Sequence, residues 1–299
     1  DAIVAGAGND VLTIGAGTNV LLYDTGDATT TEAILDLSSG GGTNTFNIVT
    51  TEDFDGNIVP NGGSAGDVLT GLNTISIAAN QTATFAGEQL TGLTVAVTGV
   101  ALGAAETLAV TTANGGGTTN LSGFTLTNAG ATITGTANAD TITGTPGNDR
   151  FLPGNGIDPL TLGTGRDTVV YTGVTNTANA NNIAAFVGGA SGDIIEIAAA
   201  GFTYSAAAAS VVNIAGVTAG ANAAKAANEI IVDAAATITG AGGSLASEFG
   251  SAAALAVASD TGAIYYDADG NFNAGAVIIG TITGGSITGT LDANNFSIV

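Results

Sequence analysis

The segment from Gly135 to Val170 divides into four repeats of nine residues. Written in nines it reads GTANADTIT, GTPGNDRFL, PGNGIDPLT and LGTGRDTVV. The sixth place of each nine is an aspartate, and these are Asp140, Asp149, Asp158 and Asp167. The eighth place is a large apolar residue, and these are Ile142, Phe151, Leu160 and Val169. Such self-similarity at a short, fixed period predicts a repetitive architecture of stacked units.

Each nine combines the residue types of a tight turn with those of a short strand. Glycine tolerates the positive φ of a tight turn, which leaves backbone carbonyls exposed. The aspartate carboxylate adds a hard, charged oxygen of the kind that calcium prefers. The apolar eighth residue points inward from the strand. Aspartate is common in ordinary turns as well, but four copies in one phase favour calcium ligands at Asp140, Asp149, Asp158 and Asp167.

A second, more degenerate block of the same repeat opens the chain. Its copies are AGAGNDVLT, IGAGTNVLL, SGGGTNTFN and GGSAGDVLT, and their sixth residues are Asp10, Asn19, Asn44 and Asp67. Asparagine keeps a carbonyl oxygen but lacks the negative charge. We therefore expect Asn19 and Asn44 to bind calcium weakly or not at all, and Asp10 and Asp67 to be weaker candidates than the later aspartates.

The rest of the chain differs in composition. Residues 68–134 show alternating apolar positions, as in Thr74–Ile77, which predicts short strands of either a calcium-free solenoid or a small sandwich. Residues 179–197 are expected to close the repeat block with a short helix or turn and then a strand. The alanine-rich stretches 221–236 and 245–259 favour helix. Tyr265-Tyr266 predicts a strand with one ring buried and one at the edge, followed by a hairpin turn.

These patterns predict a predominantly all-β fold. It comprises a parallel β-roll or β-solenoid with calcium-binding turns, a β-rich domain, and a C-terminal alanine-rich domain with a few short helices. The expected domains are a degenerate roll at 1–67, a strand-rich domain at 68–134, a roll with a closing cap at 135–197, and a C-terminal capping and secretion-signal domain at 198–299.

Composition excludes several classes of function. The chain of 299 residues has no Cys and no His, and its 3 basic and 25 acidic residues give a net charge of −22. Histidine- and cysteine-based catalysis and zinc sites lack their residues, so no enzyme is predicted. Oxygen-seeking cations, calcium above all, stay compatible with the sequence. Three basic residues cannot neutralise a nucleic-acid backbone, and no apolar run is long enough to predict membrane insertion.

The nonapeptides resemble the G-G-x-G-x-D-x-U-x calcium-binding repeat of RTX proteins, also called the hemolysin-type calcium-binding repeat. The segment from Thr261 to Asn271 and the tail Leu291–Val299 are similar to the C-terminal region of type I secreted RTX proteins. The resemblance covers 135–299 well, 1–67 weakly and 68–134 not at all. It implies a right-handed roll with two nonapeptides per coil, calcium between adjacent turns, and a C-terminal export signal. The first glycine is often replaced here, and Pro153 and Pro159 crowd the third copy.

Composition and resemblance together suggest a secreted, calcium-dependent structural protein. It would self-assemble into a surface layer (S-layer) or extracellular matrix, with calcium binding coupled to folding and assembly. Its expected partners are calcium ions, further copies of the chain in a lattice or filament, and a cell-surface polysaccharide anchored through a region outside this sequence. The alternative is the C-terminal RTX chaperone or secretion region of a secreted hydrolase (a protease or lipase) or of a large adhesin, whose active domain lies elsewhere.

Overall fold

The structure of the protein is a computed structural model that describes part of the chain. The described residues are 2–4, 11–13, 19–23, 32–36, 43–48, 51–54, 58–60, 71–99, 107–112, 116–126, 130–173, 180–202, 213–216, 229–233, 238, 253–269, 272, 275–284 and 291–299. The chain forms two compact units, residues 1–150 and 151–299, and the division falls within strand β16 (Arg150–Leu152). Each unit is described by itself.

The first unit is built from short strands. They are β1 (Ala2–Val4), β2 (Val11–Thr13), β3 (Asn19–Tyr23), β4 (Glu32–Asp36), β5 (Asn44–Ile48), β6 (Glu52–Asp53), β7 (Ile58–Pro60), β8 (Thr74–Ile77), β9 (Thr82–Ala86), β10 (Ala96–Gly99), β11 (Thr107–Thr111), β12 (Thr118–Asn120), β13 (Thr125–Leu126), β14 (Ala131–Thr134) and β15 (Thr141–Thr143). One sheet has the order β1-β3-β5-β8-β10-β13 and another the order β2-β4-β7. Strands β14-β11-β9-β6 are neighbours in a third sheet, and β12-β15 in a fourth.

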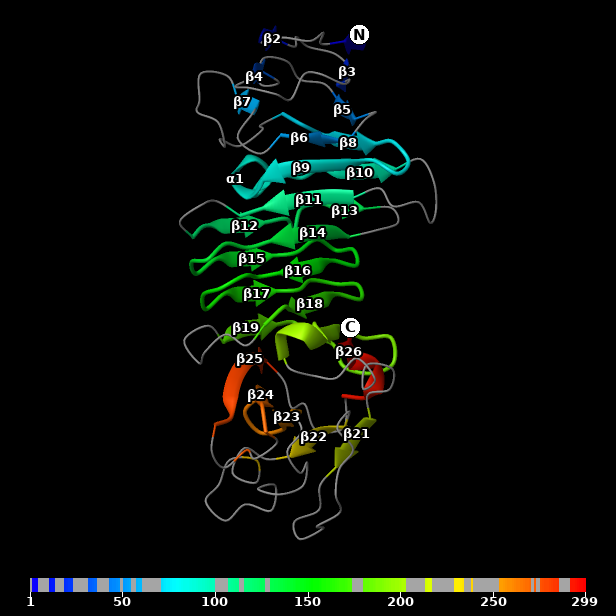
Figure 1. Cartoon of the computed structure of the whole chain (residues 1–299). Coiled ribbons are helices and arrows are strands. Elements are labelled where there is room, and N and C mark those ends of the chain that lie inside the picture. The colour runs from blue at the N-terminus through cyan, green and yellow to red at the C-terminus, as the bar shows by residue number, and fades with distance from the viewer. Residues whose placement is uncertain are drawn as a thin grey trace. The chain divides into compact units, whose positions relative to one another are not determined.

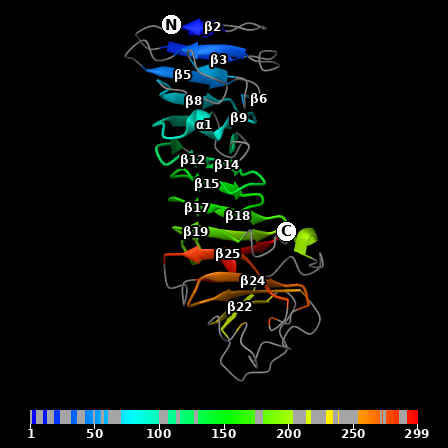
Figure 2. The same cartoon turned by 90° about the vertical axis from the view of Figure 1, so that its left-hand side faces the viewer.

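The strand pairs that the structure describes in this unit are all parallel. Strands β9, β11 and β14 lie one below another in Figure 1, and β9 again lies above β14 in the turned view of Figure 2. The chain passes from β8 to β9 and then back beside β8 as β10, so that Val97 pairs with Ile75. This path is that of a parallel roll, and the predicted all-β fold class is confirmed.

Residues 68–134 continue the strand pairing of their neighbours. Strand β8 pairs in parallel with β5 across residue 67, and β12 pairs in parallel with β15 across residue 134. The strand predicted at Thr74–Ile77 is β8. Parallel pairing on both sides favours the roll over the sandwich, since sandwiches are built from antiparallel sheets.

Side chains alternate between the interior and the surface along these strands, as the pleat of a strand requires. In β5 the buried Phe46 alternates with partly exposed polar neighbours. The Phe46 ring packs against the Phe54 ring at 5.0 Å and the Phe85 ring at 6.1 Å between centroids. The short helix α1 (Gly87–Leu90) follows β9, and its buried Gln89 donates from Nε2 to the Phe54 carbonyl at 3.1 Å. Large apolar rings therefore fill the interior of the first unit.

The second unit adds an antiparallel hairpin to parallel strands. Its strands are β17 (Pro159–Thr161), β18 (Thr168–Tyr171), β19 (Asn181–Ala184), β20 (Ile194–Ile197), β21 (Asn213–Gly216), β22 (Glu229–Asp233), β23 (Ala254–Ala258), β24 (Ala263–Asp267), β25 (Val277–Thr283) and β26 (Phe296–Ile298). Their orders are β17-β19-β25-β24-β23-β22-β21 and β18-β20-β26. Strand β24 is antiparallel to both β23 and β25, whereas β25 and β26 pair in parallel with β19 and β20. Strands from the C-terminal hundred residues thus pair directly with strands of the segment that follows the repeat.

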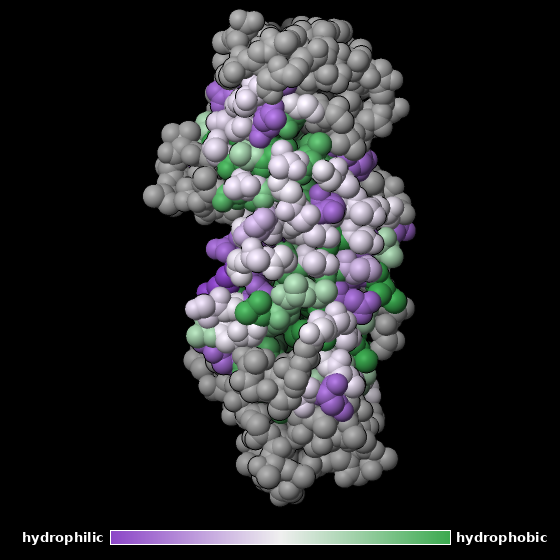
Figure 3. Space-filling model, turned by 180° about the vertical axis from the view of Figure 1, so that it is seen from behind, coloured by the Kyte–Doolittle hydropathy of each residue, from purple (hydrophilic) through white to green (hydrophobic). Residues whose placement is uncertain are grey.

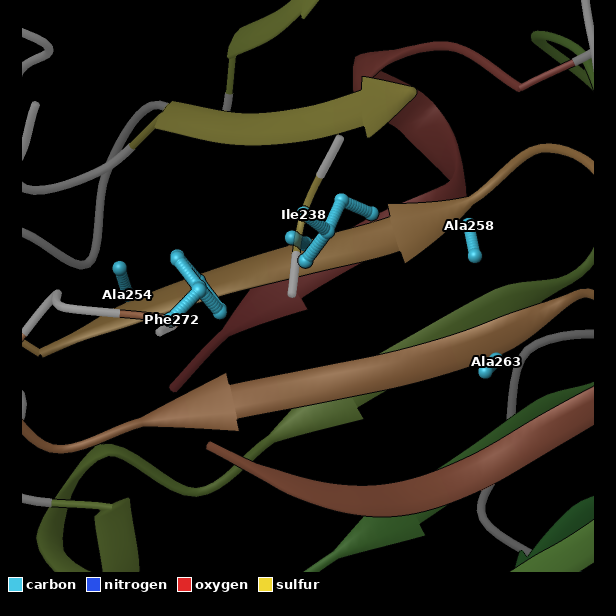
Figure 4. Close-up of a cluster of buried hydrophobic side chains, with 6 residues drawn as sticks. Ile238, Ala254, Ala258, Ala263 and Phe272 are labelled. Atoms are coloured by element: carbon cyan, nitrogen blue, oxygen red, sulfur yellow. The ribbon is translucent and has the colours of Figure 1, made fainter. Parts of the chain in front are cut away.

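Several helices predicted from alanine content and from the closing segment are strands. Residues 181–184 form β19 rather than a helix or turn, while 229–233 and 254–258 form β22 and β23. All five residues of β23 are buried, and burial in a sheet outweighs the weak helix preference of alanine. The described part of this unit includes the short 3₁₀ turns η2 (Ala199–Phe202) and η4 (Ala293–Asn295). Figure 4 shows Ile238 and Phe272 beside Ala254 and Ala258 of β23 in a small apolar cluster.

The tyrosine pair behaves as its strand predicts. Tyr266 is buried and its hydroxyl donates to the Phe202 carbonyl, whereas Tyr265 is partly exposed. Because β24 ends at Asp267 and the antiparallel β25 begins at Val277, the connection between them is a hairpin. Among the described residues, none of the helices has the length and apolarity that crossing a membrane requires.

Candidate functional site

The four predicted calcium aspartates each stand directly before a strand of the repeat. Strands β15, β16, β17 and β18 begin one residue after Asp140, Asp149, Asp158 and Asp167. The apolar eighth residues Ile142, Phe151, Leu160 and Val169 are buried, as the repeat predicts. The aspartates are buried too, with at most 2% of their surface exposed. A buried carboxylate is tolerated only when it is paired, hydrogen-bonded or bound to a metal.

Asp140 and Asp149 make the same set of hydrogen bonds, each within its own turn and to the preceding coil. Asp149 accepts from the Thr145 amide at 2.6 Å and the Thr145 hydroxyl at 2.8 Å. It also accepts from the Ala131 amide at 2.6 Å. Asp140 accepts from the Thr136 amide and hydroxyl at 2.7 and 3.0 Å and from the Gly117 amide at 3.0 Å. Both oxygens of each carboxylate therefore act as acceptors for groups of the protein itself.

The bond to the preceding coil recurs through the chain, and we call its acceptor side chains the Asx ladder. Its members are Asn73, Asp140, Asp149, Asn181 and Asp193, which accept from the amides of Asn44, Gly117, Ala131, Asp158 and Asp167 at 2.6–3.1 Å. Beside four of these five hydrogen bonds, the adjoining strands pair with each other in parallel. Thr118, for example, lies beside Thr141, and Thr168 lies beside Ile194. The ladder thus joins equivalent turn positions of successive coils.

The surroundings of two ladder members change their acidity. Burial raises the pKa of Asp149 to about 7, although hydrogen bonds from Ala131 and Thr145 act in the opposite direction. Burial also raises the pKa of Asp193, against hydrogen bonds from the Asp167 and Val187 amides and the nearby charge of Arg166. For both carboxyls the loss of water outweighs the local donors.

Arg166 ties the Asp193 turn to the C-terminal segment. Its Nε donates to the Gly192 carbonyl at 2.9 Å and its Nη2 to the Asn294 carbonyl at 3.2 Å. The buried Asn295 side chain donates to the carbonyls of Gly189 and Asp193 at 3.1 and 2.8 Å. The last residues of the chain therefore close the end of the repeat in the second unit.

The repeat turns are of two kinds. In the first two copies a threonine hydroxyl bonds the aspartate, as described for Asp140 and Asp149. In the third copy Gly154 and Gly156 adopt φ values of 85° and 118°, which favour glycine. The crowding expected at Pro159 is resolved because it is the first residue of β17, where a strand tolerates proline.

The degenerate N-terminal copies are described only in part. Asn44 is buried, and its side-chain Nδ2 donates to the Gly71 carbonyl at 3.0 Å. Its backbone amide donates to the side-chain oxygen of Asn73. Asn19 opens β3, and its backbone is in register with Asn44. Asp10 and Asp67 lie outside the described residues. The two predicted asparagines are thus brought to equivalent places on adjacent strands.

The carboxylates of Asp140 and Asp149 are largely engaged by donors of the protein itself. A calcium ion that bound both oxygens of either carboxylate would compete with amide and hydroxyl groups for lone pairs that already accept hydrogen bonds. Within the described part of the chain, no group of three or more acidic side chains converges on one point. Calcium binding at Asp140, Asp149, Asp158 and Asp167 stays a prediction.

Three ladder members, Asn73, Asn181 and Asp193, lie outside the copies of the nine-residue repeat. Each stands two residues before a buried apolar side chain, namely Ile75, Ile183 and Ile195. This short pattern of Asp or Asn, any residue, then a buried apolar residue would have found them. A fixed period of nine could not, because the coils differ in length. No protein-family model, curated protein or solved structure matches this chain.

Proposed function

We propose that the protein is a secreted structural component that self-assembles into a surface layer or extracellular matrix, with calcium acting on assembly. The observation that carries the proposal is the distribution of charge. The chain has a net charge of −22, yet strands β9, β11 and β14 contain no charged residue. Copies of such a chain can approach one another most easily across an uncharged face.

The outward side chains of β9, β11 and β14 form what we call the threonine face. Its partly or fully exposed threonines are Thr82, Thr84, Thr107, Thr111, Thr132 and Thr134. They stand in register, with Thr82 beside Thr107 and Thr111 beside Thr134. Neighbouring strands of a sheet are about 4.8 Å apart, so hydroxyl and methyl groups form a regular array. In the view of Figure 3 much of the described surface is pale, the colour of residues of intermediate hydropathy.

Electrostatics gives calcium a role in this assembly that needs no buried ligand. Like-charged copies repel one another, and the repulsion falls when divalent cations gather at exposed carboxylates. Two uncharged faces can then meet without removing a charge from water, which is the most costly part of burying polar surface. The fitting partner of the threonine face is therefore the same face of a second copy.

Charges placed on the threonine face should prevent assembly without unfolding the chain. We expect the double variant Thr84→Glu/Thr132→Glu to stay monomeric in millimolar calcium, because both copies of the face then carry like charges. Sedimentation velocity and negative-stain electron microscopy measure the assembly, and circular dichroism checks the fold. Thr94→Glu is the control, since Thr94 is exposed outside any strand. Assembly of the double variant at the wild-type level would refute the role of this face.

A further inference from the structure

We infer that the Asx ladder, rather than calcium, holds the turns of the roll closed, so that the chain reaches its β structure without metal. This inference concerns folding and does not depend on the assembly proposed above. It differs from the expectation that the RTX resemblance carries, in which calcium binding and folding are coupled.

The backbone amides at the junctions between coils need hydrogen-bond acceptors. The amides of Gly117, Asp158 and Asp167 lie one residue before a strand, and that of Ala131 belongs to the first residue of β14. A buried amide without an acceptor is costly, so nearly all such groups in folded proteins are paired. The ladder side chain of the next coil supplies the acceptor at 2.6–3.1 Å. Each ladder residue thus fixes the junction between two coils.

The carboxylates of Asp140 and Asp149 have a limited number of lone pairs. Asp149 accepts three hydrogen bonds over its two oxygens, and so does Asp140. Amide hydrogens and a cation seek the same lone pairs, and three of about four on each carboxylate are taken, so an ion that bound both oxygens would displace at least one of the bonds that shape the turn. At these two turns, bidentate ligation by calcium would therefore compete with the observed hydrogen bonds.

The ladder does not require charged side chains. Asn73 and Asn181 fill the same role through a neutral amide oxygen, at 2.8 and 3.1 Å from their donors. Loss of the carboxylate charge weakens a calcium site, because calcium affinity follows the number of charged ligands. It leaves a hydrogen-bond acceptor intact. Either residue supplies an oxygen that accepts from a backbone amide, so Asp and Asn can both occupy ladder positions.

The experiment compares the folding of the full chain with and without calcium. Far-ultraviolet circular dichroism and thermal unfolding are recorded in EGTA and in millimolar calcium. We expect the same β spectrum in both and closely similar Tm values. Asp149→Ala should lower Tm by the same amount in both buffers, since it leaves three donors without their acceptor. Asp260→Ala, at an exposed turn, removes one charge as a control and should leave Tm nearly unchanged.

Two results would overturn the inference. One is a chain that is unfolded in EGTA and regains its β spectrum at a calcium midpoint that Asp149→Ala shifts. The other is an Asp149→Ala variant whose Tm in EGTA equals that of the wild type. If Asp149→Ala does not fold in either buffer, Thr145→Val replaces it, because it keeps the carboxylate and removes only the hydroxyl that donates to Asp149 and accepts from the Gly147 amide. A lowered Tm for Thr145→Val in EGTA would mean that hydrogen bonds hold this turn without metal, and an unchanged one contradicts the inference.

Discussion

Gly201→Ala is expected to destabilise the second unit by about 3 kcal/mol or more, the cost of forcing an extra carbon into closely packed backbone. A Cβ on Gly201 would overlap the carbonyl oxygen of Thr172 and come within 2.8 Å of the Gly173 Cα. Both neighbours are backbone atoms, so no side-chain rotation can make room. The backbone is also held in place, because the Ala198 amide donates to the Tyr171 carbonyl at 2.9 Å.

Gly173→Ala is the matched control for this substitution. It lies one residue from Thr172, and a Cβ built there has no atom within 4 Å. Open space of this kind leaves a surface substitution within about 0.5 kcal/mol of neutral. Urea unfolding followed by circular dichroism gives both values. Equal stability of the two variants would show that η2 does not pack against the turn after β18 as described.

The sequence reveals the repeated positions of the roll and not the direction of their side chains. The nine-residue pattern places Asp149 before a strand and Phe151 in the core, and both are found there. A carboxylate after a tight turn can ligate a cation or accept from amides, and the residue types are the same for both. Only the position of the Ala131 amide, a full coil earlier, distinguishes them. That contact depends on how coils stack, which no local pattern contains.

Helix and strand in the alanine-rich region depend on burial in the same way. Ala254–Ala258 reads as a helix former because alanine loses little entropy in a helix. It becomes β23 because β22 and β24 pair with it on either side. A short apolar segment without polar alternation fits a buried helix or a central strand equally well. By contrast, the alternation of Thr74–Ile77 specified β8 correctly, since one face of that strand meets the core and the other does not.

The contribution of Asp149 to stability should fall as pH rises from about 4 to 7. The unfolded chain ionises this carboxyl near its ordinary pKa of 3.8, whereas burial raises the pKa in the folded chain to about 7. Below pH 3.8 both states hold the proton and the contribution is complete. Between the two values only the unfolded state releases it, which costs about 1.4 kcal/mol of stability per pH unit. Above pH 7 the contribution, about 4 kcal/mol in total by this linkage, is lost.

Asp149→Asn isolates this effect because it cannot titrate. Its amide nitrogen faces the Thr145 amide, so the variant loses stability by an amount that does not vary with pH. The measured quantity is the free energy of unfolding in urea from pH 4 to pH 8, wild type minus variant. We expect this difference to decrease with pH, and the same comparison for Asp260→Asn corrects for one charge on the chain. A difference that increases with pH would mean that the three hydrogen bonds to Asp149 outweigh its burial. The ionised carboxylate would then be the more stable form of the ladder.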